Sequence, residues 1–242
     1  EDERKKLFTL KPLNQRAWIV FGGPLANFLL AFLIFFSIYT FVGKDFTPAV
    51  INEVQKESPA EIGGLKQDDI ILEIDNNKVE SIMDVSKFIT MSTSDFIDFK
   101  VKRSYEEIIL KVKPNIVLGE DNLGNKIKKR IVGIKLGAYN DKINHVKLSP
   151  IKSAYYAIHE VYYVSTSSLK YVGAMLFGKA DTSQLGGPIR IAKISGQVAE
   201  FGFLAFVSMM AYISISLGLI NLFPIPLLDG GHLMFYAFEK VL

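Results

Sequence analysis

The sequence contains no cysteine, three histidines and a single tryptophan in 242 residues. The lack of cysteine excludes disulfides, cysteine-ligated zinc and thiol catalysis. It does not indicate a compartment, because a chain without thiols fits oxidising and reducing surroundings equally well. The three histidines, His145, His159 and His232, include no pair at a spacing that would place two metal ligands on one face of a helix.

Charge is missing from two long stretches of the chain. Residues 17–42 and 201–228 contain no Asp, Glu, Lys or Arg, and each is longer than the roughly 20 apolar residues that cross a bilayer as a helix. We predict that both are transmembrane. Residues 43–200 carry 22 Lys or Arg and 20 Asp or Glu, a balance typical of a water-exposed domain. The formal net charge of +3 therefore indicates no nucleic-acid-binding patch.

The basic residues before the first predicted span set its expected orientation. Residues 1–16 contain five Lys or Arg, and short basic flanks stay cytoplasmic. The charged middle region should then face an extracytoplasmic space, and the second span should return the chain to the cytoplasm. Because the chain starts at Glu1 and ends within a helix-like run, we expect both ends to be cuts.

The middle region alternates short β-like runs with turn and cap signals. Ser58-Pro59 predicts the start of a very short helix that ends at Gly63-Gly64, and Ser81 with Asp84 resembles a capping box for a helix that ends near Met91. Asn76-Asn77 is expected to form a hairpin turn. The expected strands are 50–54, 70–75, 96–103, 107–112 and 131–136, and the basic run 126–130 is interpreted as a solvated loop. The pattern of residues 151–177 predicts a helix that lies at the membrane surface. A short helix from Pro188 to about residue 200 is expected to follow.

The most informative segment lies at the end of the second predicted span. Residues 221–231 read Asn-Leu-Phe-Pro-Ile-Pro-Leu-Leu-Asp-Gly-Gly. A carboxylate at this depth costs about 2.5 to 3.5 kcal/mol on insertion scales, so Asp229 should be paired, metal-bound or functional. Pro224 and Pro226 break the helix just before it, which frees backbone carbonyls. The alternative is that Asp229 ends the span at the water interface and caps the following segment.

This segment resembles the Asn-x-x-Pro-x-Pro-x-Leu-Asp-Gly-Gly signature of the site-2 protease family. The resemblance implies that Asp229 is the third ligand of a catalytic Zn²⁺ and that Asn221 contacts substrate. A second family element, Gly-Pro-x-x-Asn, is present at residues 23–27, which implies Asn27 as a further substrate contact. The order of span, PDZ-like domain, surface helix and span resembles the bacterial RseP-type branch over essentially the whole chain.

One departure from the family is large. Its first transmembrane helix carries His-Glu-x-x-His, whose histidines bind zinc while the Glu activates water. Here the only His-Glu pair is His159-Glu160, and no second histidine follows. We therefore expect that helix upstream of Glu1, no catalytic residue in this chain and no activity of the chain alone. His232 shares a possible helix face with Asp229 and is interpreted either as a further ligand or as an interfacial hydrogen-bonding residue.

The middle region also resembles a PDZ domain, through residues 50–54, Ser58-Pro59-Ala60, Gly64-Leu65 and 69–74. The family's peptide-receiving loop is most similar to Val132-Gly133-Ile134, which comes last, so the strand order looks circularly permuted. Gly133 and Ile134 are the implied binding residues for a peptide or protein C-terminus. The helix bearing Val85, Phe88 and Ile89 would provide either the other wall of the groove or domain core.

Together these features predict a polytopic α-helical membrane protein with an inserted extracytoplasmic PDZ-like α+β domain. The expected parts are a cytoplasmic flank (1–16), a span (17–42), the PDZ-like domain (43–147), surface helices (148–200), a span ending in Leu-Asp-Gly (201–229) and the start of a further segment (230–242). The resemblance implies an intramembrane zinc metalloprotease in the bacterial cytoplasmic membrane. Its substrates would be single-span membrane proteins such as anti-sigma factors or remnant signal peptides, gated by the PDZ domain. The alternative is a non-catalytic membrane-anchored PDZ adaptor or pseudoprotease.

Overall fold

The computed structural model describes residues 8–120, 126–139, 143–178 and 187–241. The chain divides into two compact units. We call them the helical unit (Glu1–Phe41, Ser149–Thr166 and Gln197–Leu242) and the sheet unit (Val42–Leu148 and Ser167–Gly196).

The helical unit contains α1 (Leu13–Ser37), α6 (Phe203–Leu222), α7 (Asp229–Val241) and the first part of α4 (Pro150–Leu176). A short 3-10 turn, η2 (Phe8–Leu10), precedes α1, and a π-helical segment, η3 (Ile38–Val42), extends it. The segments Leu13–Val42 and Phe203–Leu222 are long and apolar enough to cross a membrane, judged by length and composition. The second helix ends six residues before the predicted end of the span, because the backbone leaves the helix ahead of Pro224.

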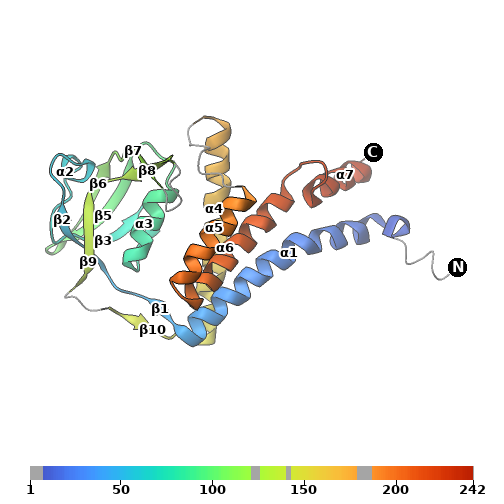
Figure 1. Cartoon of the computed structure of the whole chain (residues 1–242), viewed down its shortest axis with the longest axis horizontal. Coiled ribbons are helices and arrows are strands. Elements are labelled where there is room, and N and C mark those ends of the chain that lie inside the picture. The colour runs from blue at the N-terminus through green and yellow to red at the C-terminus, as the bar shows by residue number, and fades with distance from the viewer. Residues whose placement is uncertain (1–7, 121–125, 140–142, 179–186, 242) are drawn as a thin grey trace. The chain divides into compact units, whose positions relative to one another are not determined.

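Small and aromatic side chains form the core of the helical unit. α1 packs against both α6 and α7 (Figure 1). The buried cluster combines residues from α1, α4 and α6, and it comprises Ala31, Phe35, Ala157, Val164, Ala211, Ile215 and Leu219. Phe35 also meets Tyr212 edge to face, with ring centroids 5.3 Å apart.

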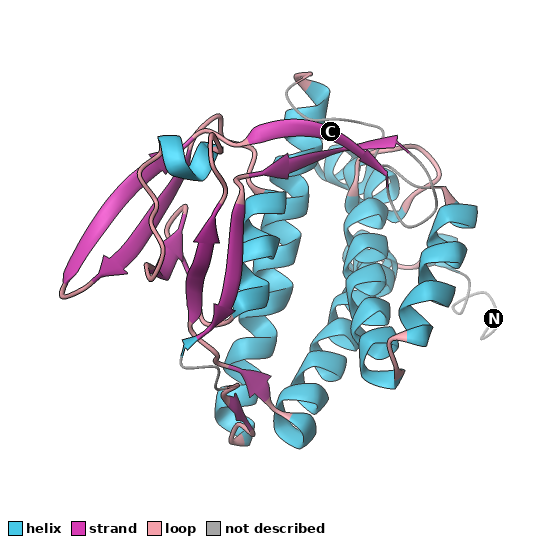
Figure 2. Cartoon of the chain, turned by 60° about the vertical axis from the view of Figure 1, so that its left-hand side comes forward, coloured by secondary structure: helices cyan, strands magenta, loops and turns pink. Residues whose placement is uncertain are grey.

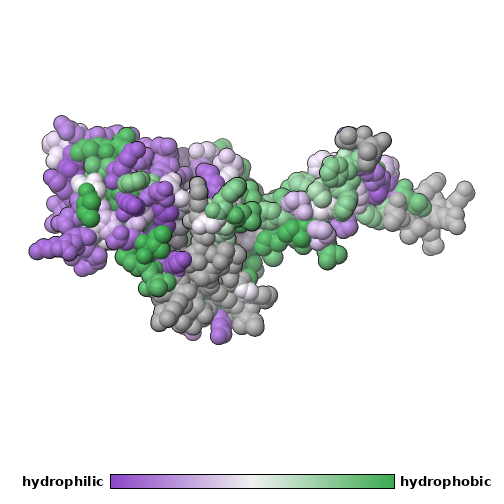
Figure 3. Space-filling view, turned by 90° about the horizontal axis from the view of Figure 1, so that it is seen from above, coloured by the Kyte–Doolittle hydropathy of each residue, from purple (hydrophilic) through white to green (hydrophobic). Residues whose placement is uncertain are grey.

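Apolar side chains also cover much of the outer surface of the helical unit. Trp18 is 68% exposed, Leu29 54% and Leu33 48%, although all three lie on α1. Figure 3 shows this apolar surface in green. Residues 17–37 of α1 carry no charge, and an exposed apolar stripe along them is compatible with a lipid-facing surface.

The sheet unit is built on a six-stranded antiparallel sheet (Figure 2). Its main path runs β6 (Glu106–Val112), β5 (Ile97–Arg103), β3 (Ile70–Ile74), β2 (Ala49–Val54) and β9 (Ile134–Ala138), and β4 (Asn77–Lys78) pairs with β3. A separate two-stranded pairing joins β1 (Lys44–Asp45) to β10 (His145–Val146). β9 lies at the edge of the main path and pairs there with β2, while its permuted position relative to a PDZ domain stays a prediction.

Two short helices accompany the sheet, and both start at the predicted caps. Ser58 accepts a hydrogen bond from the Glu61 N–H and starts α2 (Pro59–Ile62). Ser81 and Asp84 form the predicted capping box of α3 (Ile82–Met91). The hairpin turn differs by one position: Asp75 and Asn76, with φ of 48° and 62°, adopt the left-handed conformation in place of Asn76 and Asn77.

The interpretation of residues 126–130 as a solvated loop is wrong. They belong to β8 (Lys126–Ile131), which pairs with β7 (Asn115–Glu120). Arg130 donates hydrogen bonds to the carbonyls of Ser92 and Ser94, which follow the C-terminus of α3. Burial lowers the pKa of the Arg130 guanidinium, while the carboxylates of Asp75 and Asp95 act in the opposite direction. A run of like charges hid this strand, and the two carbonyls that Arg130 contacts lie 38 and 36 residues away in the sequence.

The remaining predicted helices are present. α4 covers the expected surface helix, and α5 (Pro188–Glu200) begins at the predicted proline. The position of either helix at a membrane surface stays a prediction.

Candidate metal-binding site

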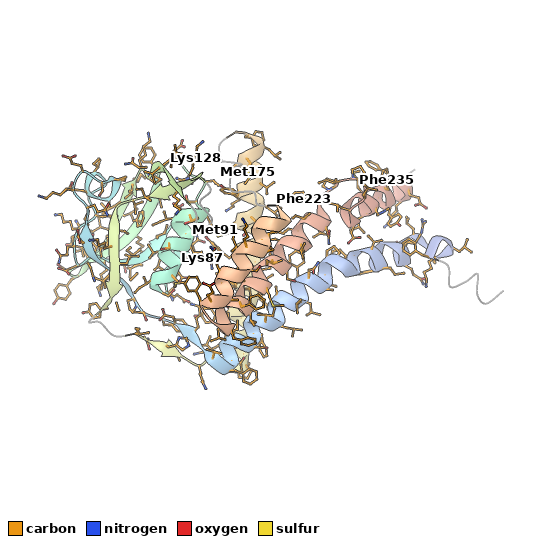
Figure 4. All side chains as sticks on the ribbon, viewed as in Figure 1. Lys87, Met91, Lys128, Met175, Phe223 and Phe235 are labelled. Carbon is orange, nitrogen blue, oxygen red and sulfur yellow. The ribbon has the colours of Figure 1, made fainter. Side chains whose placement is uncertain are left out.

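The predicted break in the helix lies between α6 and α7. α6 ends at Leu222, residues 223–228 are not helical, and α7 begins at Asp229. Leu227 has a φ of 79°, a conformation that non-glycine residues rarely adopt. In Figure 4, Phe223 and Phe235 mark the end of α6 and the middle of α7. The backbone therefore turns sharply and presents Asp229 in the first turn of a new helix, where a carboxylate is favoured by the helix dipole.

The two glycines after Asp229 let the turn close tightly. A Cβ built at Gly230 would collide with the backbone of Leu222 and Phe223, and one at Gly231 would collide with the carbonyl of Ile225. Both glycines are buried. The Asp-Gly-Gly sequence is therefore required by close backbone packing between the start of α7 and the end of α6.

The carboxylate of Asp229 faces α1. Its Oδ2 lies 2.9 Å from a Cβ built at Gly23, the first residue of the Gly-Pro-x-x-Asn element. Asp229 is half-buried, and within the part of the chain that the structure describes its side chain makes no hydrogen bond or ion pair. The structure thus brings the two family elements together and leaves the carboxylate available to a ligand.

Asn27 lies four residues after Gly23 in α1, close to α6. The Ser214 hydroxyl donates a 2.8 Å hydrogen bond to the Asn27 carbonyl. A Cβ built at Gly218 would lie 3.1 Å from the Phe28 ring and 3.3 Å from Asn27 Cβ. α1 and α6 therefore approach closely at this point, and the Asn27 side chain itself hydrogen-bonds to no described residue.

The other site candidates occupy different positions. Asn221 is half-buried in the last turn of α6. His232 is exposed on α7 and stacks loosely on Tyr236, with ring centroids 6.5 Å apart. His159 stacks on Tyr155. Across the described ranges no three His, Cys, Asp or Glu side chains gather into a metal-binding group, so His232 gains no support as a ligand.

Gly133 and Ile134 lie in the sheet unit, at the start of the edge strand β9. Gly133 has a φ of 81°, and a Cβ there would collide with the Ser58 side chain. Its carbonyl accepts a hydrogen bond from the Gln55 N–H. A side chain at position 133 would therefore strain the backbone and displace Ser58. Val85, Phe88 and Ile89 are all buried, which identifies them as domain core.

The residues present fit one part of a zinc site. A catalytic zinc is held by three protein ligands of the His, Asp or Glu type, and the free carboxylate of Asp229 is one suitable donor. The absence of a side chain at Gly23 leaves space for that carboxylate against α1. Among the described residues, Asp229 is thus one candidate ligand, and Gly23 leaves the space that its carboxylate occupies.

Two residues that shape the candidate site were not predicted from the sequence. Gly23 was noted as part of a motif but not as the neighbour of Asp229, and Ser214 was not singled out. Small residues and serines in an apolar helix are a signal for close helix contacts. The sequence does not indicate which helix they contact.

The comparisons with known proteins agree with this geometry. The sequence matches peptidase family M50 over residues 1–242. A protein of Agrobacterium fabrum, provisionally named a zinc metalloprotease, is 36% identical over 240 residues, which cover 99% of this chain and 64% of the relative. The metalloprotease MmpA of Caulobacter vibrioides is 31% identical over 255 residues, covering 100% of this chain and 63% of MmpA. The chain thus spans less than two thirds of the length of these relatives.

A solved PDZ domain of an SdrC-like protein from Listeria monocytogenes is also similar to part of the chain. It is 22% identical, with a TM-score of 0.31, and the match covers 38% of this chain and 88% of that domain. The family predicted from residues 221–231 is confirmed by the match over the whole length. The chain belongs to peptidase family M50, the site-2 protease family.

Proposed function

We propose that this chain is part of an intramembrane zinc metalloprotease and that Asp229 is a ligand of its zinc. The observation that carries the proposal is the carboxylate of Asp229, which has no hydrogen-bond or ion-pair partner among the described residues and is placed by a broken helix against Gly23 in α1. An unpaired carboxylate in an apolar span is costly, and a bound cation would remove that cost.

The zinc would activate a water molecule and polarise the peptide carbonyl. Asp229 would supply one of its protein ligands, and a His-Glu-x-x-His helix elsewhere in the full-length protein would supply the others. Asn27 and Asn221 would contact the substrate through amide groups that have no hydrogen-bond partner among the described residues. An extended substrate backbone needs such partners within a membrane.

The substrate class proposed from the family resemblance is a single-span membrane protein, such as an anti-sigma factor or a remnant signal peptide. The sheet unit would select it. β9 is an edge strand of the main sheet, so a peptide could add to it by β-augmentation beginning at Ile134. The protein would be a multi-pass component of the bacterial cytoplasmic membrane with its PDZ-like domain outside the cytoplasm.

A non-catalytic adaptor or pseudoprotease is the competing function. The two differ in whether Asp229 binds metal, so metal content separates them. We expect Asp229→Ala in the full-length protein to abolish substrate cleavage and to lower bound zinc. Glu200→Ala, which removes an exposed carboxylate from the end of α5, is the control and should retain both. Full zinc content and full cleavage in Asp229→Ala would contradict the proposed ligand.

A further inference from the structure

We infer that Gly23 is a positioning residue for the Asp229 carboxylate: its missing side chain fixes where that carboxylate can lie. The inference rests on the proposed role of Asp229 as a zinc ligand. It assigns to the glycine of the Gly-Pro-x-x-Asn element a function that is separate from substrate contact.

The first observation is the distance between the two residues. A Cβ built at Gly23 lies 2.9 Å from Asp229 Oδ2 and 3.9 Å from its Cγ. The shorter value is well inside the normal separation of non-bonded carbon and oxygen atoms. Even alanine at position 23 would therefore require the carboxylate to move.

The second observation is that contacts near both of its ends hold the backbone of α7 in place. Gly230 and Gly231 already lie against carbonyls at the end of α6 with no room for a Cβ. Near the other end of α7, Glu239 forms a 2.6 Å ion pair with Arg16 of α1. The Arg16 guanidinium also lies 5.1 Å from the centre of the Tyr236 ring. α7 is thus held at its start by the end of α6 and the loop after it, and near its other end by α1.

Because the backbone is held, a side chain at position 23 would change the rotamer of Asp229. A rotated carboxylate would point its oxygens away from the position they occupy beside Gly23. Metal sites tolerate little displacement of a ligand, and disturbing the residues that orient a ligand typically weakens metal binding 10-fold to 100-fold. Gly23 would therefore influence zinc binding without contacting the zinc.

The chain supplies its own control in the preceding residue. Gly22 lies in the same helix, and a Cβ built there meets nothing within 4 Å. Alanine is the better helix former at either position, so neither substitution should weaken α1 itself. Only the substitution at position 23 introduces an atom beside Asp229.

The first experiment compares Gly23→Ala with Gly22→Ala in the full-length protein. Zinc affinity is measured by competition with a chelator, alongside substrate cleavage. We expect Gly23→Ala to bind zinc about 10-fold to 100-fold more weakly and Gly22→Ala to match the unsubstituted protein. Equal zinc affinity in the two glycine variants, with zinc lost in Asp229→Ala, would overturn the role of Gly23 alone. Normal zinc binding in Asp229→Ala would instead contradict the proposed function.

The second experiment tests the contact without metal or activity. The chain has no cysteine, so a disulfide between two introduced cysteines has no competing thiol in this chain. In native membranes, Gly23→Cys with Asp229→Cys should form a disulfide under mild oxidation, because the Cβ position of residue 23 lies beside the Asp229 side chain and a disulfide needs such proximity. Gly22→Cys with Asp229→Cys should form it far less. Failure of the first pair to cross-link, or equal cross-linking of both, would remove the geometric basis of the inference.

Discussion

The Ser214 hydroxyl of α6 donates a 2.8 Å hydrogen bond to the backbone carbonyl of Asn27 in α1. Both residues lie within apolar helices that are candidates to span a membrane. The bond therefore joins the two helices where the Gly-Pro-x-x-Asn element sits. One turn further along α6, Gly218 allows the Phe28 ring to approach the helix backbone. These two contacts set the separation of α1 and α6.

Replacing Ser214 should weaken this helix pair. We expect Ser214→Ala to lower the free energy of unfolding by about 0.6 kcal/mol, the average for hydrogen bonds between membrane helices. Ser216→Ala is the matched control, because the Ser216 hydroxyl bonds only within α6, to the Tyr212 carbonyl. Steric trapping of the chain in bicelles measures the free energy of unfolding of both variants. An equal change in the free energy of unfolding of the two variants would show that the interhelical hydrogen bond does not stabilise the helix pair.

A second prediction concerns the ion pair at the centre of the sheet unit. Arg103 donates hydrogen bonds of 2.7 and 2.8 Å to Asp69, whose side chain is fully buried, and another to the Gly64 carbonyl. The bond to Asp69 raises the pKa of Arg103 above its usual range. Removing one partner of a buried pair leaves an uncompensated charge. Arg103→Ala should therefore destabilise the sheet unit by about 3 kcal/mol.

The control for Arg103 is an exposed ion pair in the same sheet. Lys135 and Glu53 are 62% and 55% exposed, so Lys135→Ala should cost less than about 1 kcal/mol. Amide hydrogen exchange of β3 and β5 in the intact chain measures the loss of stability in each of the two variants. Similar protection in the two variants would contradict the structural role assigned to Arg103.

Local signals in the sequence predicted the parts of the fold that depend on neighbouring residues. The capping box of α3 is an example, because Ser81 and Asp84 satisfy each other's backbone without any distant partner. The break before Asp229 is another, because prolines act on their own helix. The expectation of a permuted strand order rests on a family resemblance and not on a local pattern.

Long-range pairing could not be predicted in the same way. β8 reads as a charged loop, since four of its six residues are basic, and the contact of Arg130 with Ser92 at the end of α3 joins residues 38 apart in the sequence. The contact between Gly23 and Asp229 joins positions over 200 residues apart. A motif shows that such residues are special, but only the packed helices show what they contact.

Gly133 should be essential for the sheet unit. Its φ of 81° disfavours any side chain, and a Cβ would also collide with Ser58, the N-cap of α2. We expect Gly133→Ala to destabilise the unit by about 2 kcal/mol or more. Gly64→Ala is the matched control, because Gly64 has a similar φ of 84° but open space, with Leu110 3.7 Å away. Hydrogen exchange of the Ala60 N–H, which bonds the Val132 carbonyl, should report a larger loss for Gly133→Ala.

The last prediction is topological. The five basic residues before the first apolar segment should hold residues 1–16 in the cytoplasm, and the charged middle region should then lie outside it. Single cysteines can test this, because the chain has none of its own. Lys78 is a suitable position in the middle region, since its side chain is 77% exposed on β4, and Gln15 is an exposed position at the start of α1. A membrane-impermeant maleimide should label Lys78→Cys in spheroplasts, and it should label Gln15→Cys only after the membrane is opened. Labelling in the reverse order would show that the basic flank does not set the orientation, and it would place the PDZ-like domain in the cytoplasm.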